Sequence, residues 1–277
     1  MNLYKYLKFI ANPKKYYHAS IHEKVNNAIK NELRMQSVDT ILETDVVVAG
    51  YPKSGNTWFQ NIITGLYFGI DLDYCNYNLI SSLSVDIHID KYYKRYGDVV
   101  FFKSHLQPQP NYKKAILLIR DGRDVMVSYY HHLKKYENPN ITYEDLLSSK
   151  TTFLPYGAWD IHVNSWLDNP YKADILVIKY EDMLLNTMTQ VDKVCTFLNI
   201  DRPQSLKTKV IQQSSFGEMK NREITKGWGS YESNPDKTNT FVRKGISGSY
   251  KQEFPAHLLS DYTNKIYPTL TKLGYEV

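Results

Sequence analysis

The sequence contains only two cysteines, Cys75 and Cys195, among its 277 residues. Two cysteines cannot build a disulfide framework, and the chain has no CxxC pair or Cys/His cluster of the kind that binds zinc. The sequence therefore predicts reduced, structural thiols and no metal site.

Long hydrophobic runs are also absent from the sequence. The longest uncharged stretch, residues 54–70, contains polar side chains and falls short of a membrane span. The N-terminus lacks the apolar core of a signal peptide, so we expect a cytoplasmic protein without a stable membrane anchor. Leu3, Leu7 and Ile10 repeat at helical spacing. They predict that residues 1–44 form a helical segment that packs on its own domain or, alternatively, meets a membrane surface or a partner.

The chain carries no strong excess of charge of either sign. Its formal net charge is +5 and its pI is near 8.8, which is too mild for a protein that coats nucleic acid. A localised basic pocket for a polyanionic small molecule is the better interpretation. The length and the 42% hydrophobic content suit one domain over residues 1–277.

Short apolar, β-branched runs alternate with helical patterns. Near-continuous runs of this kind are typical of strands buried on both faces, and their alternation with helices predicts a single α/β domain with a central parallel sheet flanked by helices. Ligands of such sheets bind at the carboxyl ends of the strands. Residues 217–242 are rich in polar residues and glycine and are expected to form a loop that acts as a lid. The expected strands are residues 46–49, 99–102, 115–119 and 175–178, and the expected helices are residues 57–66, 124–133, 157–167 and 189–198.

The segment from Gly50 to Trp58 has the pattern of a phosphate-binding loop between a strand and a helix. Backbone N–H groups at the start of the helix face an anion, and Lys53 adds a full charge. The two glycines have the spacing of a Walker A motif, but Asn56-Thr57 stands where that motif has Lys-Ser/Thr. The sequence therefore favours phosphate binding over magnesium-dependent hydrolysis, and a fortuitous turn is the alternative.

Two further basic segments predict a second and a third phosphate contact. Arg120 follows the expected strand 115–119, and Ser128 lies within the next helix. Arg123 is placed either at this site or in a pair with Asp124. Far along the chain, Arg243-Lys244-Gly245 combines two cations with a glycine that lets the backbone approach an anion closely. Three such sites imply a donor with separated phosphate groups.

These motifs resemble those of the cytosolic sulfotransferase family, which uses 3'-phosphoadenosine 5'-phosphosulfate (PAPS) and releases PAP. The resemblance covers roughly residues 45–251 and implies the P-loop-like sulfotransferase fold. Its motifs are YPKSGNTW at residues 51–58, RDGRDVMVSYYH at 120–131, RKGISG at 243–248, and shorter matches at 103–106, 156–159, 180–183 and 214–216.

The resemblance also implies roles for the donor-site residues. Lys53 would hold the bridging and sulfuryl oxygens, within a loop completed by Ser54, Gly55, Asn56 and Thr57. The adenine ring would lie between Trp58 and Phe216, and Tyr180 and Ser214 would complete the adenosine site. The family's short C-terminal dimerisation motif is not visible after Lys251, which leaves the oligomeric state open.

Sulfuryl transfer needs a base for the acceptor and positive charge near the leaving phosphate. His105 is the candidate base because a neutral imidazole accepts a proton near pH 7. Lys53 and Lys103 supply the charge, and no metal is required. His131 and His132 are expected to face solvent.

The chain has 24 tyrosines, several of which could line an aromatic acceptor pocket or belong to the core. Tyr77, Tyr156 and His162 are the candidates for acceptor binding, with a structural role as the alternative for His162. Trp228 and Tyr231 lie in the expected lid. A small molecule sulfated on a hydroxyl or a nitrogen is favoured. A narrower hypothesis is an enzyme of bacterial secondary metabolism that acts on a guanidinium alkaloid, similar to the saxitoxin-type sulfotransferases.

Two other functions fit parts of the pattern. A P-loop nucleotide kinase would show magnesium-dependent ATP turnover, and a non-enzymatic nucleotide- or RNA-binding protein would show salt-dependent RNA affinity without any need for His105. The sequence favours neither, and we expect no nucleic-acid partner.

Overall fold

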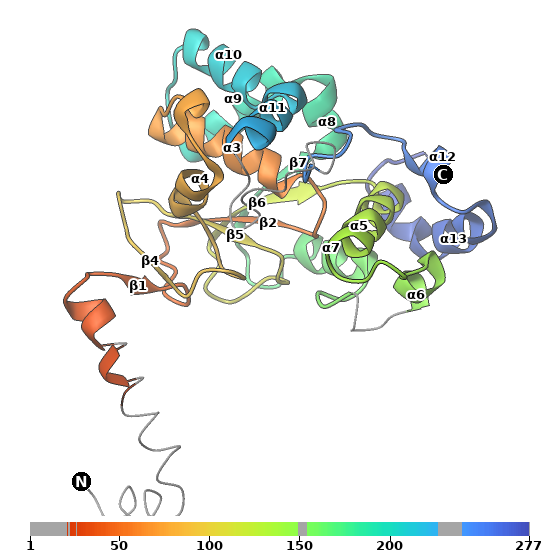
Figure 1. Cartoon of the computed structure of the whole chain (residues 1–277), viewed down its shortest axis with the longest axis horizontal. Helices are drawn as coiled ribbons and strands as arrows, with labels where there is room; N and C mark the ends of the chain where they lie inside the picture. The colour runs from red at the N-terminus through yellow and green to blue at the C-terminus, as the bar shows by residue number, and fades with distance from the viewer. Residues whose placement is uncertain (1–20, 22, 26, 149–153, 227–239, 277) are drawn as a thin grey trace, which may run out of the picture.

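A central parallel sheet organises the chain (Figure 1). The computed structural model describes residues 21–148 except 22 and 26, residues 154–226 and residues 240–276. The five parallel strands lie in the order β3 (Ser84–Asp86), β5 (Phe101–Ser104), β2 (Val46–Gly50), β6 (Lys114–Ile119) and β7 (Asp174–Lys179). The predicted α/β architecture is confirmed. The short strand β3 was not predicted.

Alternate residues of the central strands face two separate cores, as the two-residue repeat of a strand requires. Val47 and Ala49 of β2 belong to one hydrophobic cluster, whereas Val46 and Val48 belong to the other. All five residues of β2 are buried. A strand covered on both faces can therefore be apolar throughout.

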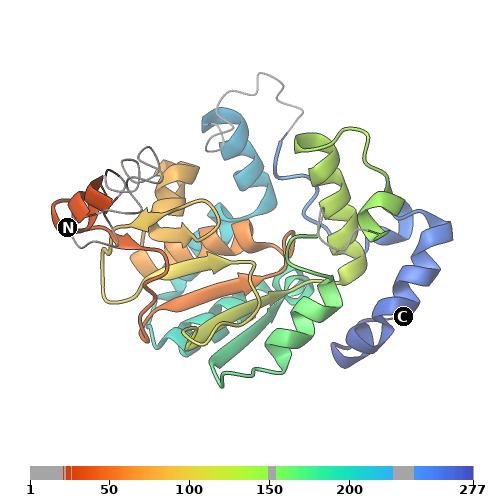
Figure 2. The same ribbon diagram turned by 90° about the horizontal axis from the view of Figure 1, so that it is seen from below.

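Helices cover both faces of the sheet (Figures 1 and 2). One core contains side chains from η1 (Leu72–Tyr74), α3 (Asn56–Phe68), α4 (Tyr77–Leu83), α8 (Tyr180–Leu185), α9 (Thr187–Leu198) and α10 (Gln204–Gln213). The opposite core contains side chains from α5 (Gly122–Tyr136), α6 (Tyr143–Ser148), α7 (Trp159–Leu167) and α13 (Ala256–Lys272), with α12 (Tyr250–Glu253) packed against it. The four predicted helices correspond to α3, α5, α7 and α9.

Three expectations about the fold need correction or restriction. Strand β7 is only partly buried, with Val177 39% exposed, because it lies at the sheet edge and pairs on one side only. Residues 216–226 form the helix α11 rather than a loop. The rest of the expected lid, residues 227–239 with Trp228 and Tyr231, lies outside the described residues, as do residues 1–20.

The N-terminal part of the described chain carries short elements of its own. Residues 27–31 are helical. Strands β1 (Gln36–Ser37) and β4 (Tyr92–Tyr93) then form a small antiparallel pair. Within the described part of the chain, no helix combines the length and the apolarity needed to cross a membrane.

The carboxyl ends of the five strands form one edge of the sheet, and the candidate residues follow them. His88 lies shortly after β3, His105 follows β5, Lys53 follows β2, Arg120 follows β6 and Tyr180 follows β7. The chain runs from β2 to β3 and β5 on one side and later to β6 and β7 on the other. The crevice of a doubly wound sheet opens at such a reversal.

Candidate active site

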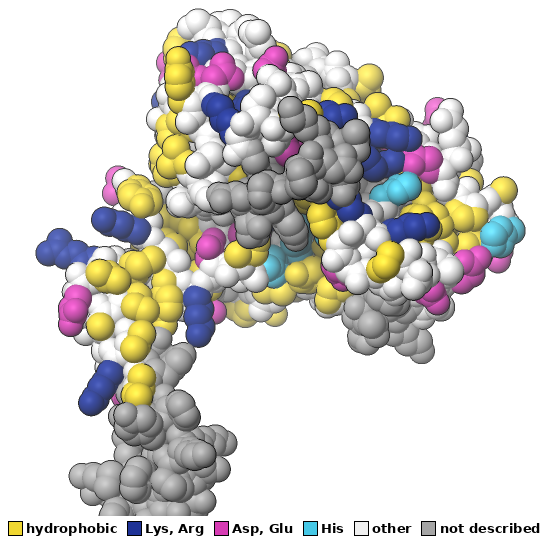
Figure 3. All heavy atoms as spheres, in the orientation of Figure 1, with side chains coloured by type: hydrophobic (Ala, Val, Ile, Leu, Met, Phe, Trp, Pro, Cys, Tyr) yellow, Lys and Arg dark blue, Asp and Glu magenta, His cyan; other side chains and the backbone are white. Residues whose placement is uncertain are grey.

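A cavity of about 500 Å³ lies at this edge of the sheet. It is lined by residues of the phosphate loop, of the segments after all five strands, of α5 and α11, and of the stretch around Arg243. On the face shown in Figure 3, Lys and Arg side chains lie next to histidine side chains. The predicted donor and acceptor residues that line the cavity are Lys53, Gly55, Asn56, Thr57, Trp58, Tyr77, Lys103, His105, Arg120, Ser128, Tyr156, Tyr180, Phe216, Arg243, Lys244 and Gly245.

The phosphate loop turns sharply into α3. Lys53 and Gly55 have φ angles of 73° and 97°, and a Cβ added to Gly55 would lie 2.8 Å from the Tyr180 ring. Only glycine fits this position without strain. The first helical hydrogen bond runs from the Phe59 N–H to the Gly55 carbonyl. The backbone N–H groups of the preceding helical residues therefore remain for an anion at the positive end of the helix.

Of the two residues that stand at the Lys-Ser/Thr positions of a Walker A motif, one departs from the motif and the other matches it. Thr57 keeps the hydroxyl of that motif and lines the cavity. Only the lysine is replaced, by Asn56, whose side-chain amide donates to the Tyr51 carbonyl over 3.2 Å. The asparagine stabilises the loop and brings no charge, so Lys53 is the loop's cation.

The Lys53 ammonium lies in a strongly positive environment. Burial, followed by the charges of Lys103, Arg120 and Arg243, lowers the pKa of Lys53 to about 7. Its Nζ lies 4.4 Å from the centre of the Phe241 ring. A polyanion in the cavity would favour the charged form of this lysine.

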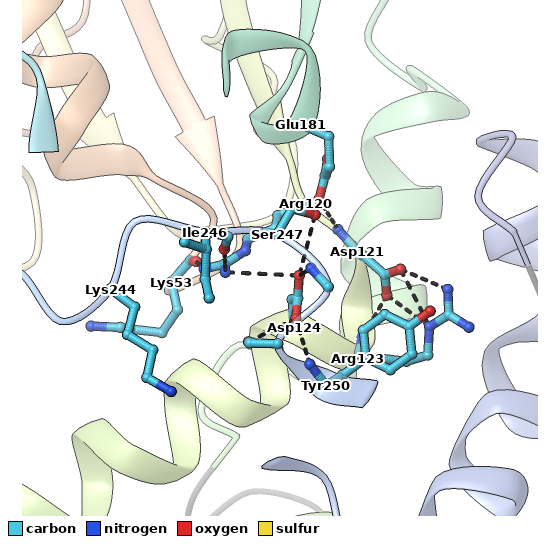
Figure 4. A network of polar contacts seen from close by, with 12 residues as sticks. Lys53, Arg120, Asp121, Arg123, Asp124, Glu181, Lys244, Ile246, Ser247 and Tyr250 are labelled. Carbon is cyan, nitrogen blue, oxygen red and sulfur yellow. Dashed lines mark hydrogen bonds and ion pairs between the residues drawn. The ribbon is translucent and has the colours of Figure 1, made fainter. Parts of the chain in front are cut away.

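Arg120 connects the first and third basic segments (Figure 4). Its guanidinium donates to the Lys53 carbonyl over 3.2 Å and to the Ile246 carbonyl over 2.9 Å, and it lies 3.9 Å from the Asp124 carboxylate. Asp124 is fully buried and accepts N–H groups from Gly248 and Tyr250. The three predicted phosphate segments thus meet at one place.

Arg123 does not belong to this site. Its guanidinium pairs with Asp121 over 2.7 Å and donates to the Glu276 carbonyl. Figure 4 shows it on the opposite side of the network from Lys53 and Lys244. The alternative of a structural pair was therefore right, although the partner is Asp121 rather than Asp124.

The third basic segment is held in place by a carboxylate. Arg243 and Lys244 contact Glu253 over 2.7 and 2.9 Å. Gly245 has a φ of 65°, and a Cβ added to it would overlap the Phe216 ring. This glycine lets an aromatic wall of the cavity approach the basic segment.

Two predicted donor residues do not line the cavity. The side chains of Ser54 and Ser214 are buried, and neither hydroxyl has a partner among the described residues. They contribute to the walls behind the site in this structure. Trp58 and Tyr180 do line the cavity and contact each other edge to face, with ring centroids 5.5 Å apart.

These features fit a nucleotide that carries two separated phosphates. Lys53 and the start of α3 are candidates for one anion site, and Arg120, Ser128, Arg243 and Lys244, which line the same cavity, are candidates for another. Aromatic rings lie beside both. The groups at these sites are cations and backbone N–H groups, as the recognition of several phosphates requires.

His105 is fixed at the other side of the phosphate loop. Its Nδ1 lies 2.6 Å from the Gly50 carbonyl, and its own carbonyl lies 3.0 Å from His162 Nε2. Burial, followed by the positive charge of Lys103, lowers the pKa of His105 to about 3. The imidazole is therefore neutral at physiological pH.

Lys103 is paired with a residue that the sequence did not single out. Its ammonium donates to the buried Asp86 carboxylate over 2.6 Å. Burial alone would raise the pKa of Asp86, but the Lys103 charge and hydrogen bond lower it below its usual value. An ion pair with Asp86 thus holds the Lys103 ammonium.

The acceptor candidates divide into two groups. Tyr77 and Tyr156 line the cavity, whereas His162 is fully buried and packs edge to face on Tyr51, with ring centroids 5.4 Å apart. The prediction that His162 lines the acceptor pocket is wrong, because its buried ring contacts the His105 carbonyl through Nε2 instead of facing the cavity.

His132 was predicted to face solvent, but it lines the cavity. Burial, followed by the charge of Lys53, lowers the pKa of His132 to about 4. The spacing could have shown this, because His132 follows Ser128 by four residues on the same helical face. His131 instead contacts Glu253 over 2.9 Å. Asp86 and His88 also line the cavity and were missed.

The fold and the cavity define a class of protein that binds a polyanionic nucleotide at the carboxyl edge of a parallel sheet, next to a neutral histidine. Comparison with known proteins identifies the family. Residues 43–274 match the sulfotransferase domain, and Sulfotransferase 1E1 of Rattus norvegicus is 33% identical over 237 residues, which cover 77% of this chain and 79% of that relative. The chain belongs to the sulfotransferase family.

Other relatives and solved structures agree with this assignment. Sulfotransferase 1 family member D1 of Mus musculus is 28% identical over 256 residues, which cover 84% of this chain and 87% of the relative. Retinol dehydratase in complex with androsterone and inactive cofactor PAP has a TM-score of 0.67, with 18% identity, 86% of this chain and 83% of that chain covered. Mouse sulfotransferase SULT7A1 complexed with PAP has a TM-score of 0.64, with 22% identity, 84% and 86% covered. These structures share the fold.

Proposed function

We propose that the basic half of the cavity binds PAPS and that the half around His105 binds a small-molecule acceptor, which receives the sulfuryl group on a hydroxyl or a nitrogen. The hydrogen bond between His105 Nδ1 and the Gly50 carbonyl, 2.6 Å long, carries this proposal. It attaches the candidate base to the first residue of the phosphate loop, so base and leaving-group site share one rigid support.

The same hydrogen bond determines which nitrogen acts as the base. A carbonyl oxygen can only accept, so Nδ1 of the neutral ring must carry the proton. The lone pair then lies on Nε2. A base positioned in this way contributes about 10² to 10⁴ in rate.

Lys53 and Lys103 provide positive charge near the reacting centre. The bound donor supplies an electrophilic sulfuryl group and a phosphate leaving group. As the acceptor atom bonds to sulfur and the bond from sulfur to the phosphate oxygen breaks, His105 Nε2 takes the acceptor proton. Lys53 compensates the charge that develops on the phosphate. Lys103 must share its ammonium between Asp86 and this centre, since the two side chains are 2.6 Å apart.

The test measures transfer from radiolabelled PAPS to a panel of small hydroxyl and amine acceptors. His105→Ala should lower transfer by about 10²-fold or more and leave PAP affinity within about twofold. His257→Ala is the matched control, because His257 is exposed and its ring contacts Glu144, which is also exposed, over 3.0 Å. Full activity of His105→Ala would exclude His105 as the base.

A narrower proposal concerns the acceptor's chemical class. Tyr77, Tyr129 and Tyr156 line the cavity together with Glu137. Aromatic faces and carboxylates favour a planar or cationic molecule, which supports the hypothesis of a guanidinium alkaloid of the saxitoxin type from bacterial secondary metabolism. The acceptor panel should therefore include planar guanidinium compounds beside neutral phenols. A strong preference for the phenols would contradict this narrower proposal.

The two rival functions are tested with the same protein. A thermal-shift panel with PAP, ATP with magnesium, and an oligonucleotide should show marked stabilisation by PAP alone. Indifference to PAP would contradict the proposed donor site. The cytoplasmic location, the oligomeric state and the lid role of residues 217–242 stay predictions.

A further inference from the structure

His88 contacts the candidate base in two ways. The two imidazole rings stack with centroids 5.1 Å apart and an angle of 14° between their planes. The His105 backbone N–H donates to His88 Nε2 over 2.8 Å. His88 and His105 both line the cavity, so His88 is placed to contact the base and a bound acceptor.

The hydrogen bond to His88 Nε2 determines whether the other ring nitrogen, Nδ1, donates or accepts. Nε2 accepts a hydrogen bond, so in the neutral ring the proton lies on Nδ1. Nδ1 is 3.3 Å from the Tyr156 hydroxyl. Nδ1–H must therefore donate to this hydroxyl, and the hydroxyl's own proton is left for a third group. Tyr156 lines the same cavity.

The surroundings of His88 keep its ring neutral. Burial lowers the pKa of His88, and the Lys103 charge lowers it further, while the Asp86 charge opposes both. The carboxylate of Asp86 is occupied by Lys103 and by the His88 backbone N–H, which donates to it over 3.0 Å. The assignment of the proton to Nδ1 applies to this neutral form of His88.

We propose that His88 is a positioning residue that fixes the His105 ring and turns the Tyr156 O–H toward the acceptor. The site would then select acceptors with a hydrogen-bond acceptor atom beside the group that is sulfated. This inference rests on the proposed function of the site, because it assigns the acceptor-side geometry of that reaction.

The first experiment needs no acceptor and uses the ligand-free protein. Nitrogen-labelled histidine gives NMR signals that distinguish the two neutral tautomers, and His88→Gln and His105→Gln assign them. We expect His88 and His105 both to carry the proton on Nδ1. Protonation of His88 on Nε2 would overturn the proposal, and this result is independent of whether any acceptor is sulfated.

The second experiment compares variants with guaiacol and ortho-cresol as acceptors. His88→Phe keeps an aromatic ring but removes both hydrogen bonds, and it should lower kcat by about 10²-fold through misplacement of the base, with PAP affinity within about twofold. His88→Gln, whose side-chain carbonyl can accept the His105 N–H, should recover part of this loss.

Acceptor selectivity separates positioning from a merely structural role. Wild-type protein should prefer guaiacol, whose methoxy oxygen can accept from Tyr156, and Tyr156→Phe and His88→Phe should each abolish this preference. A wild-type kcat in His88→Phe, or an unchanged preference in both variants, would overturn the proposal. Melting temperatures check that each variant is folded. Failure of the wild type to transfer sulfate to any acceptor would count against the proposed function, while the tautomer result still decides the inference.

Discussion

Lys53 has a pKa of about 7 in the ligand-free site, so the affinity for PAP should fall as the pH rises above neutrality. The sign follows from the charge of the ligand. A polyanion binds the protonated lysine, and the lysine must take up a proton before binding wherever it is neutral. The affinity is therefore fully present below the ligand-free pKa and is lost above it.

The size of the effect follows from the same pKa. If only the charged form binds, about 90% of Lys53 is competent at pH 6 and about 3% at pH 8.5, so Kd should rise about 30-fold over this range. This corresponds to about 2 kcal/mol. Ionisation of the ligand's phosphates is nearly complete above pH 7, so it cannot cancel the loss at higher pH.

Isothermal titration calorimetry with PAP measures this dependence directly. Lys53→Arg is the matched control, because an arginine stays charged throughout the range and should give a nearly flat profile. At pH 8 the wild type should also take up about 0.9 proton per PAP bound, which buffers of different ionisation enthalpy reveal. Parallel pH profiles of wild type and Lys53→Arg would refute the argument.

Further substitutions test the phosphate loop, the core and the third basic segment. Gly55→Ala should destabilise the protein by about 1–3 kcal/mol and weaken PAP binding, because its φ is 97° and the new Cβ would meet Tyr180; denaturant unfolding and calorimetry measure both. Asp45→Asn should cost about 3–5 kcal/mol in denaturant unfolding, since buried Asp45 holds Arg95 through two bonds of 2.7 and 2.8 Å. Glu253→Gln should strengthen PAP binding a few-fold at low salt, and weaker binding would show that the carboxylate mainly orients the cations.

The proposed donor half of the cavity was predictable because local patterns encode it. The loop from Gly50 to Trp58 combines an apolar strand, a glycine turn and a helix start. Arg120 directly follows a run of buried residues. Such signals need only the strand period and the parallel arrangement, which brings all strand ends to one edge.

The acceptor half was less predictable because its elements carry weak local signals. Strand β3 has three residues and no apolar run, so Asp86 and His88 could not be placed at the edge of the sheet. Helix α11 was mistaken for a loop because its sequence is polar. Its position depends on tertiary contacts: Met219 is buried, and Arg222 contacts Asn61 over 2.8 Å.

Resemblance placed Ser214 at the donor site, and His162 was a candidate for the acceptor pocket, whereas the structure buries both. A motif shows that a residue belongs to a family's pattern, but it does not show whether the side chain faces the cavity or supports its wall. For His162 the hydrogen bond to the His105 carbonyl gives the reason. The ring holds the backbone of the candidate base.

The two halves of the cavity depend on different parts of the chain. Arg120 ties the phosphate loop to the segment at Ile246, and Asp124 holds the residues that follow. None of these contacts involves β3 or the segment between β3 and β5. His88 and Tyr156, in contrast, contact each other, His88 contacts the base, and the base in turn bonds to the Gly50 carbonyl of the phosphate loop. We therefore expect substitutions around His88 to change acceptor choice while Arg120 keeps its contacts with Lys53 and Ile246.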